Sequence, residues 1–109
     1  MGKSIKIKEL LKPSLFTQIT GDEESLEREI FVADLNRPGF ELAGFFKHSD
    51  FRRVILLGEK EIAFIQEMSR ESQLACFSKL VNDETPCIII AKGYPCPDIL
   101  KNIASKRKF

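Results

Sequence analysis

Two short stretches of uninterrupted apolar residues organise the hydrophobic pattern of this chain. The first covers residues 54–57 and ends at Gly58, and the second covers residues 87–91. A short apolar run bounded by turn residues is typical of a strand that is covered on both faces. Helical spacing of apolar positions fills the interval between the runs and returns after the second one. This order predicts two parallel strands joined by helices in a right-handed crossover.

Three helices are predicted in this half of the chain, over residues 59–68, 70–81 and 98–104. Ser69 is placed to cap the second helix, and Pro97 can take the first helical position of the third. The predicted buried positions are Ile62, Phe64, Ile65 and Met68 in the first helix, Leu74, Phe77, Leu80 and Val81 in the second, and Ile99, Leu100 and Ile103 in the third. A further strand after the third helix would complete the pattern, so we expect the sequence to be one domain of a longer protein.

The first third of the chain has a weaker pattern. Residues 5–12 start with strand-like alternation and turn helical, with Ile7, Leu10 and Leu11 on one face, before Pro13 stops the helix. Residues 15–20 and 26–32 are candidate strands, and the acidic stretch 21–24 is predicted as a solvated turn. The overall expectation is an α/β fold with a small mixed sheet and helices on its faces.

Residues 34–46, Asp-Leu-Asn-Arg-Pro-Gly-Phe-Glu-Leu-Ala-Gly-Phe-Phe, form the most distinctive stretch. Asn36 is a residue type that starts turns and caps helices, and Pro38 has its φ fixed near the helical value. Phe40, Ala43 and Phe46 then recur at helical spacing. This pattern predicts a short helix that buries its aromatic residues against a core.

The glycine spacing in this stretch invites comparison with a phosphate-binding loop. Four residues separate Gly39 from Gly44, as in the first half of a P-loop, but Phe45 and Phe46 stand where Lys and Ser/Thr would reach the phosphates and the magnesium ion. The full P-loop pattern occurs nowhere in the chain. Nucleotide binding at this position is therefore not expected.

The partner of Arg37 is not determined by the sequence of this stretch. Structural pairing with an acid such as Asp34 or Glu41 is favoured, and binding of an anion is the alternative. We accordingly take Arg37, Asn36 and Glu41 as the candidate ligand or interface residues, and we assign no catalytic, cofactor-binding or metal-binding residue. His48 and Asp50 lie close in sequence, but a surface-loop histidine is favoured over a catalytic dyad.

Composition narrows the remaining possibilities. A chain of 109 residues with 43% apolar and 30% charged residues is an ordinary globular domain. The net charge of +1 gives no argument for nucleic acid or a membrane surface, and the basic residues near the C-terminus are expected to complement a helix dipole. Three cysteines with one histidine cannot build a zinc site at normal spacing. A cytoplasmic protein with three free, buried thiols is the simplest expectation.

The stretch 34–46 resembles the signature of the N-terminal domain of bacterial HPr kinase/phosphorylase. Flanking segments agree in order: residues 10–21 resemble the opening helix and strand of that family, 53–61 its Arg-(apolar run)-Gly-x-x-Glu segment, and 85–90 its Pro-(apolar) strand. The resemblance covers nearly all of residues 1–109.

This resemblance implies a fold similar to the N-terminal domains of Mur ligases. It also implies that the full-length parent is a hexameric, cytoplasmic transferase, a serine protein kinase that uses ATP or pyrophosphate with magnesium. That enzyme phosphorylates the phosphocarrier HPr of the phosphotransferase system, reverses this by phosphorolysis, and acts in carbon catabolite repression. Its P-loop and catalytic residues belong to a separate C-terminal domain, so none is carried over to this chain. We therefore expect a non-catalytic regulatory or structural domain; the alternative is a stand-alone sensor of an anionic metabolite.

Overall fold

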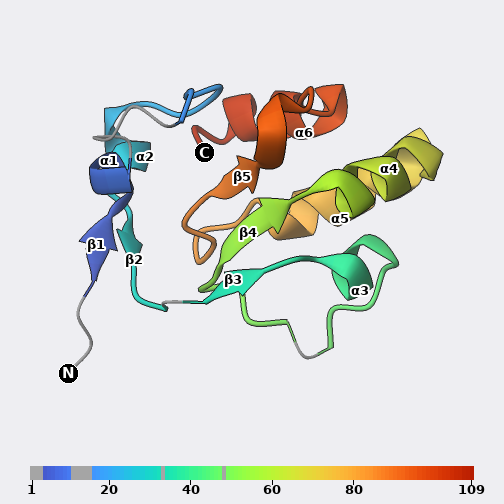
Figure 1. Cartoon of the computed structure of the whole chain (residues 1–109), viewed down its shortest axis with the longest axis horizontal. Coiled ribbons are helices and arrows are strands. Elements are labelled where there is room, and N and C mark those ends of the chain that lie inside the picture. Colours follow the sequence, from blue (N-terminus) through green and yellow to red (C-terminus); the bar gives the residue numbers. More distant parts are fainter. Residues whose placement is uncertain (1–3, 11–15, 33, 48) are drawn as a thin grey trace.

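The computed structural model describes residues 4–10, 16–32, 34–47 and 49–109. Its centre is a three-stranded parallel sheet in the order β3-β4-β5 (Figure 1). The strands are β3 (Leu35–Asn36), β4 (Val54–Leu57) and β5 (Ile88–Ile90). Both predicted apolar runs are confirmed as strands, and they are parallel neighbours, as their shared apolar character indicated.

Side chains alternate between the two faces of this sheet. Ile55 and Leu57 of β4 are buried in the main core, and Ile88 and Ile90 of β5 pack against that core beside them. Val54 and Ile89 belong instead to a smaller cluster on the opposite face. Because both faces of β4 are covered, its sequence is apolar at every position.

The main core lies between the sheet and four helices on one face. These are α3 (Gly39–Leu42), α4 (Glu59–Glu67), α5 (Arg70–Leu80) and α6 (Asp98–Lys106), and a short 3-10 turn, η1 (Ala91–Gly93), follows β5. The predicted helices 59–68, 70–81 and 98–104 are confirmed, as is the cap at Ser69, whose Oγ accepts a hydrogen bond from the backbone N–H of Ser72 at 3.1 Å. Phe64 and Leu74, predicted as buried, are 46% and 53% exposed. Pro97 is the residue that flanks α6 rather than its first helical residue.

A small N-terminal unit covers the other face of the sheet (Figure 1). It contains β1 (Ile5–Lys6), α1 (Ile7–Leu10), α2 (Glu23–Leu26) and β2 (Glu29–Ile30), and β1 pairs antiparallel with β2. Ile7 and Ile30 carry its contact with Val54. The fold class is thus α/β, with one parallel and one antiparallel small sheet.

The structure corrects several N-terminal predictions. Helix α2 begins within the predicted turn 21–24, at Glu23, because the Asp22 carboxylate accepts the backbone N–H of Ser25 at 3.0 Å and caps the first turn. The predicted strand 26–32 shrinks to Glu29–Ile30. Within the described residues 16–20 there is no strand, and the remainder of that prediction, like Leu11 and Pro13, lies outside the described part of the chain.

The basic residues at the C-terminal end are exposed, as expected, but Arg107 and Phe109 also make contacts with the rest of the domain. Arg107 donates from Nη1 to the carbonyl oxygens of Ser78 and Val81, at 2.7 and 2.6 Å, where α5 ends. Phe109 packs against the main core, and its carbonyl oxygen accepts a hydrogen bond from Thr20 Oγ1 at 2.7 Å. No helix within the described ranges is long and apolar enough to cross a membrane.

Candidate functional site

The stretch 34–46 folds as a strand end, a tight turn and one turn of helix. Asn36 is the last residue of β3, in register with Ile55, and is not the cap of α3. Pro38 flanks α3 with no side-chain cap bond, and its side chain is fully buried. The helix ends after Leu42, since Gly44 adopts a left-handed φ of +94°.

The prediction that α3 buries an aromatic stripe is wrong. Phe40 is 76% exposed and Phe45 49% exposed, and their rings meet edge to face at 6.1 Å. The buried side of α3 consists of Glu41 and Leu42 instead. Only Phe46 of the predicted aromatic anchors packs against the core. The helix is too short to continue the 3.6-residue spacing from which the stripe was inferred.

The backbone of this turn is not arranged to hold phosphate. The N–H groups of Leu42, Ala43, Gly44 and Phe45 donate to carbonyl oxygens of residues 38–41, at 2.9 to 3.3 Å. A P-loop presents such N–H groups to the nucleotide. Here they are used within the turn, in agreement with the failure of the P-loop pattern at Phe45 and Phe46.

Arg37 meets an acid that sequence reasoning did not select. Its Nε lies 3.4 Å from Oε1 of Glu61 on α4, whereas the expected partners were Asp34 and Glu41. The same Glu61 oxygen accepts the backbone N–H of Gly58 at 2.7 Å. One buried carboxylate therefore holds both the start of α4 and the guanidinium that follows β3.

Gly58 makes this arrangement possible. A Cβ at this position would overlap Nη2 of Arg37 and would lie 3.1 Å from Glu61 Oε1. The bond from the Gly58 N–H to the Glu61 carboxylate is one half of a capping box, because glycine has no side chain to supply the other half. A glutamate three residues after the residue that precedes a helix is a signal that the sequence carried. Parallel pairing of β3 and β4 then brings Arg37 beside Glu61.

Glu41 lies in a separate arrangement. It is 8% exposed, its Oε2 accepts a hydrogen bond from Ser49 Oγ at 2.7 Å, and its carbonyl oxygen accepts the Cys76 thiol at 3.4 Å. These contacts fix the loop after α3 and join it to α5. Arg37 and Glu41 thus point to different neighbours, and His48 lies outside the described residues.

The cysteines are thiols in protected surroundings. Burial raises the pKa of Cys76 and of Cys87 to about 11, and it raises the pKa of Cys96 as well. A thiol with a raised pKa is a poor nucleophile at neutral pH. Within the described parts of the chain, no three His, Cys, Asp or Glu side chains are grouped as ligands for a metal ion.

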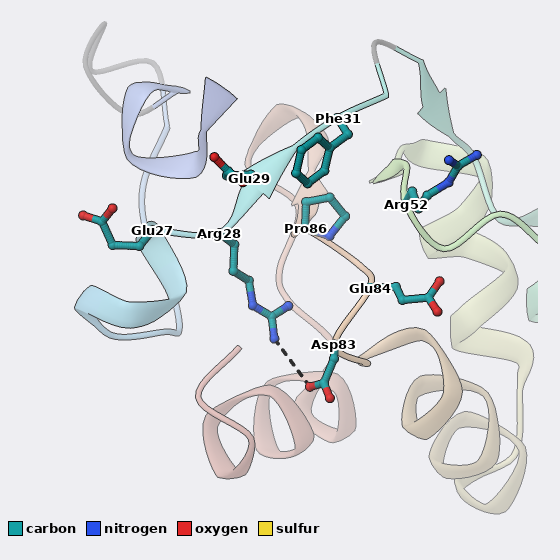
Figure 2. A pocket seen from close by; sticks show the side chains of 8 residues that line it. All are labelled: Glu27, Arg28, Glu29, Phe31, Arg52, Asp83, Glu84 and Pro86. Carbon is teal, nitrogen blue, oxygen red and sulfur yellow. Dashed lines mark ion pairs between the residues drawn. The ribbon is translucent and has the colours of Figure 1, made fainter. Parts of the chain in front are cut away.

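A charged hollow of about 440 Å³ lies between the N-terminal unit and the loop before β5 (Figure 2). Its lining residues are Glu27, Arg28, Glu29, Phe31, Arg52, Asp83, Glu84 and Pro86. Arg28 points across it and lies 4.0 Å from Asp83, while its Nη1 donates to the carbonyl oxygens of Thr85 at 2.6 Å and Asn82 at 3.3 Å. The Arg28 guanidinium also lies 5.2 Å from the ring centre of Phe109. Arg28 therefore connects three segments that are far apart in sequence.

A second hollow, of about 730 Å³, runs along β5 and is mainly apolar. Residues 16–20 and α1 line one side of it, and α6 and Phe109 line the other. Neither of the two hollows is lined by Arg37, Asn36 or Glu41. Arg37, Asn36 and Glu41 thus lie apart from these two hollows.

The chain is a small α/β domain. Its most distinctive residues, Arg37, Gly58 and Glu61, contact one another where β3 and the start of α4 meet, and we call this contact the Arg37–Gly58–Glu61 corner. Comparison with known proteins agrees with this class: a family described as HPr Serine kinase N terminus matches residues 5–109. The chain belongs to this family.

Several similar curated proteins share the name HPr kinase/phosphorylase. The chain is 35% identical over 105 residues to HPr kinase/phosphorylase of Streptococcus sanguinis (strain SK36), which covers 96% of the chain and 34% of that protein. It is 35% identical over 106 residues to the protein of the same name from Enterococcus faecalis (strain ATCC 700802 / V583), covering 97% and 34%. The chain spans about a third of the length of these relatives.

Proposed function

We propose that this chain acts as a non-catalytic, regulatory or structural N-terminal module of an HPr kinase/phosphorylase. The observation that carries the proposal is the family match over residues 5–109, together with relatives of that name of which the chain spans a third. In this proposal, phosphorylation of HPr with ATP or pyrophosphate and magnesium, and its reversal by phosphorolysis, take place in another part of the longer protein. Control of carbon catabolite repression and assembly into cytoplasmic hexamers are proposed for that whole protein.

The geometry of the motif supports a module without phosphoryl chemistry. The backbone N–H groups around Gly44 are used within their own turn, and the Arg37 guanidinium already has the Glu61 carboxylate as its counter-charge. Both features stiffen the connection between β3, α3 and α4. A stiff module of this kind is suited to transmit or maintain an arrangement of neighbouring domains.

The test is phosphoryl transfer by the pure 109-residue chain. Incubation with HPr, magnesium and either ATP or pyrophosphate is expected to give no phosphoserine by mass spectrometry. In the full-length gene product, removal of residues 1–109 is expected to leave transfer intact while changing the ratio of kinase to phosphorylase activity. Phosphoserine formed by the isolated chain would overturn the proposal.

A sensor of anionic metabolites is the second candidate, and the structure supports it less. Arg37 is 58% exposed and has donors to spare, but Glu61 offsets its charge and occupies the start of α4 where an anion would bind. For a sensor, an anionic metabolite should raise the melting temperature of the native chain and leave that of Arg37→Ala unchanged. A full panel without any effect would remove this candidate.

A further inference from the structure

The free edge of β5 carries backbone groups that point away from the sheet. The N–H of Ile55 donates to the carbonyl oxygen of Cys87 at 3.1 Å, so residue 87 faces β4. In a parallel ladder the residues of a strand face alternate sides, so Ile89 faces β4 and Ile88 and Ile90 direct their N–H and C=O groups outward. Among the described residues, β5 pairs with β4 alone.

This edge borders the apolar hollow of about 730 Å³. All three isoleucines of β5 line it, and all three are only half buried. No described residue pairs with this apolar edge, and an edge of this kind is a template for pairing with another strand. The hollow continues past the end of β5 to Lys92 and Gly93, so it is long enough for an extended segment beside the whole strand.

The connections of the sheet specify on which side a next strand would lie. Leu42 of α3, Ile62 of α4 and Phe77 of α5 all join the core on one face, and the strands proceed in the order β3-β4-β5. Helix α6 packs into the same core through Ile99, Leu100 and Ile103. With right-handed crossovers, a helix on this face is followed by a strand on the outer side of the preceding one. For α6, that side is the free edge of β5.

The end of α6 lies at the hollow. Phe109 lines it, and its backbone N–H donates to the carbonyl oxygen of Ala104 at 2.9 Å, which turns the chain back over the helix end. Figure 1 shows the C-terminus beside the N-terminal unit and close to β5. A polypeptide leaving α6 here reaches the free edge with few connecting residues.

We propose that the free edge of β5 is a docking site for one extended, apolar strand, which pairs parallel to β5 through Ile88 and Ile90. The occupant is the segment that follows this N-terminal region in the longer members of the family, which are about three times the length of this chain. The sheet then has four parallel strands, and the hollow is filled by the side chains of the added strand. The proposal rests on sheet geometry and is independent of any catalytic activity.

Amide hydrogen exchange tests this in two forms of the protein. One is the 109-residue chain, and the other carries after Phe109 the ~25 residues that follow the matched region in the S. sanguinis relative, enough for a turn and one strand. The amides of Ile88 and Ile90 are expected to exchange roughly 100-fold more slowly in the extended form, while that of Ile89 changes little. Equal exchange of Ile88 and Ile90 in the two forms would overturn the proposal.

Proline substitutions provide the matched control. Ile90→Pro removes an N–H that faces the hollow, so it should abolish the added protection of Ile88 in the extended form and leave the β4–β5 pairing of the short form in place. Ile89→Pro removes an N–H that faces β4, so it should disrupt that pairing in both forms. A short form that sediments as a dimer with Ile88 and Ile90 already protected would make a second copy the occupant and would also overturn the proposal.

Discussion

The two faces of the parallel sheet are covered by parts of the molecule that are held in different ways. On one face, α3 to α6 enclose a continuous apolar core in which Phe77, Leu57 and Leu80 are almost fully inaccessible to solvent. On the other, the described residues of the N-terminal unit contribute Ile7 and Ile30 as buried apolar contacts with Val54, with Leu10 and Leu26 partly buried beside them. Its position depends on polar links, chiefly those of Arg28 and the bonds of Thr20 and Ser25 to the carbonyl oxygens of Phe109 and Lys108.

Because of this difference, we expect the N-terminal unit to detach under conditions in which the sheet and its helices remain folded. Loss of apolar burial on the helical face removes the main source of stability, so the whole chain should unfold. Loss of a polar link should release the N-terminal unit and leave the sheet with its helices folded.

The largest effect is expected for Phe77→Ala. Phe77 has no exposed surface, and truncating a buried phenylalanine costs about 3–5 kcal/mol, a large share of the about 5–15 kcal/mol that holds a domain together. Urea denaturation followed by circular dichroism should show most of the stability lost. Phe64→Ala, at a position on α4 that is 46% exposed, should cost less than about 1 kcal/mol. Equal losses for the two variants would contradict the assignment of the core.

The next effect is expected for Arg28→Ala. This change removes donors to the carbonyl oxygens of Thr85 and Asn82 and should cost about 2 kcal/mol, mainly in the attachment of the N-terminal unit. Amide exchange should speed up in β1 and β2 but not in β4.

Arg52→Ala is the matched control for this change, because Arg52 lines the same hollow (Figure 2). Its charge is paired at the surface with Asp50. The substitution should cost below about 1 kcal/mol. If Arg28→Ala sped amide exchange equally in β1, β2 and β4, the N-terminal unit would not open independently of the parallel sheet, and the expectation would be wrong.

The same contrast explains which elements the sequence predicts. Residues 54–57 and 87–91, and the helices around them, bury long apolar surfaces, and burial imposes a period that is visible in the chain. The N-terminal unit has short elements whose positions are set by contacts distant in sequence, such as Arg28 with Thr85, and these leave no local pattern. Asp22 and Ser25 did carry a capping signal, but the run of carboxylates around them favoured a solvated turn.

The candidate site was predicted in part for the same reason. The turn at Arg37 that opens α3 followed from Pro38 and Gly39, but strand β3 directly before it was not predicted. The partner of Arg37 did not follow either, because Glu61 becomes its neighbour only through the parallel pairing of β3 with β4. Phe40 shows the opposite error: its spacing predicted burial, but α3 ends too soon to bring it to the core.

A smaller loss of stability is expected from substitutions at the Arg37–Gly58–Glu61 corner, which holds the start of α4 through polar contacts. Glu61→Ala leaves the buried Gly58 N–H without its acceptor and should cost about 1.5 kcal/mol. Glu59→Ala, an exposed carboxylate in the same first turn, should cost a few tenths of a kcal/mol by urea denaturation, ~0.3.

Arg37→Ala separates the cap from the ion pair at this corner. Because Arg37 is 58% exposed, its removal should cost less than about 1 kcal/mol and leave the start of α4 intact. If Arg37→Ala destabilised the chain as much as Glu61→Ala, the ion pair rather than the cap would be the important contact.

The smallest effect is expected from acid, and it should appear on the N-terminal unit and on the loop before β4. Hydrogen bonds from Lys6 and then Lys8 lower the pKa of Glu27 from 4.5 to about 2, and those from Arg52 lower the pKa of Asp50 from 3.8 to about 2. A carboxylate with a lowered pKa contributes stability above its unfolded value, and this contribution is lost as the pH falls from about 4 to about 2. Carboxyl chemical shifts in an NMR titration report each group. The double variant Lys6→Ala, Lys8→Ala should raise the pKa of Glu27 and leave that of Asp50 unchanged. If Glu27 titrated near 4.5 in the native chain, the two lysines would not be lowering its pKa.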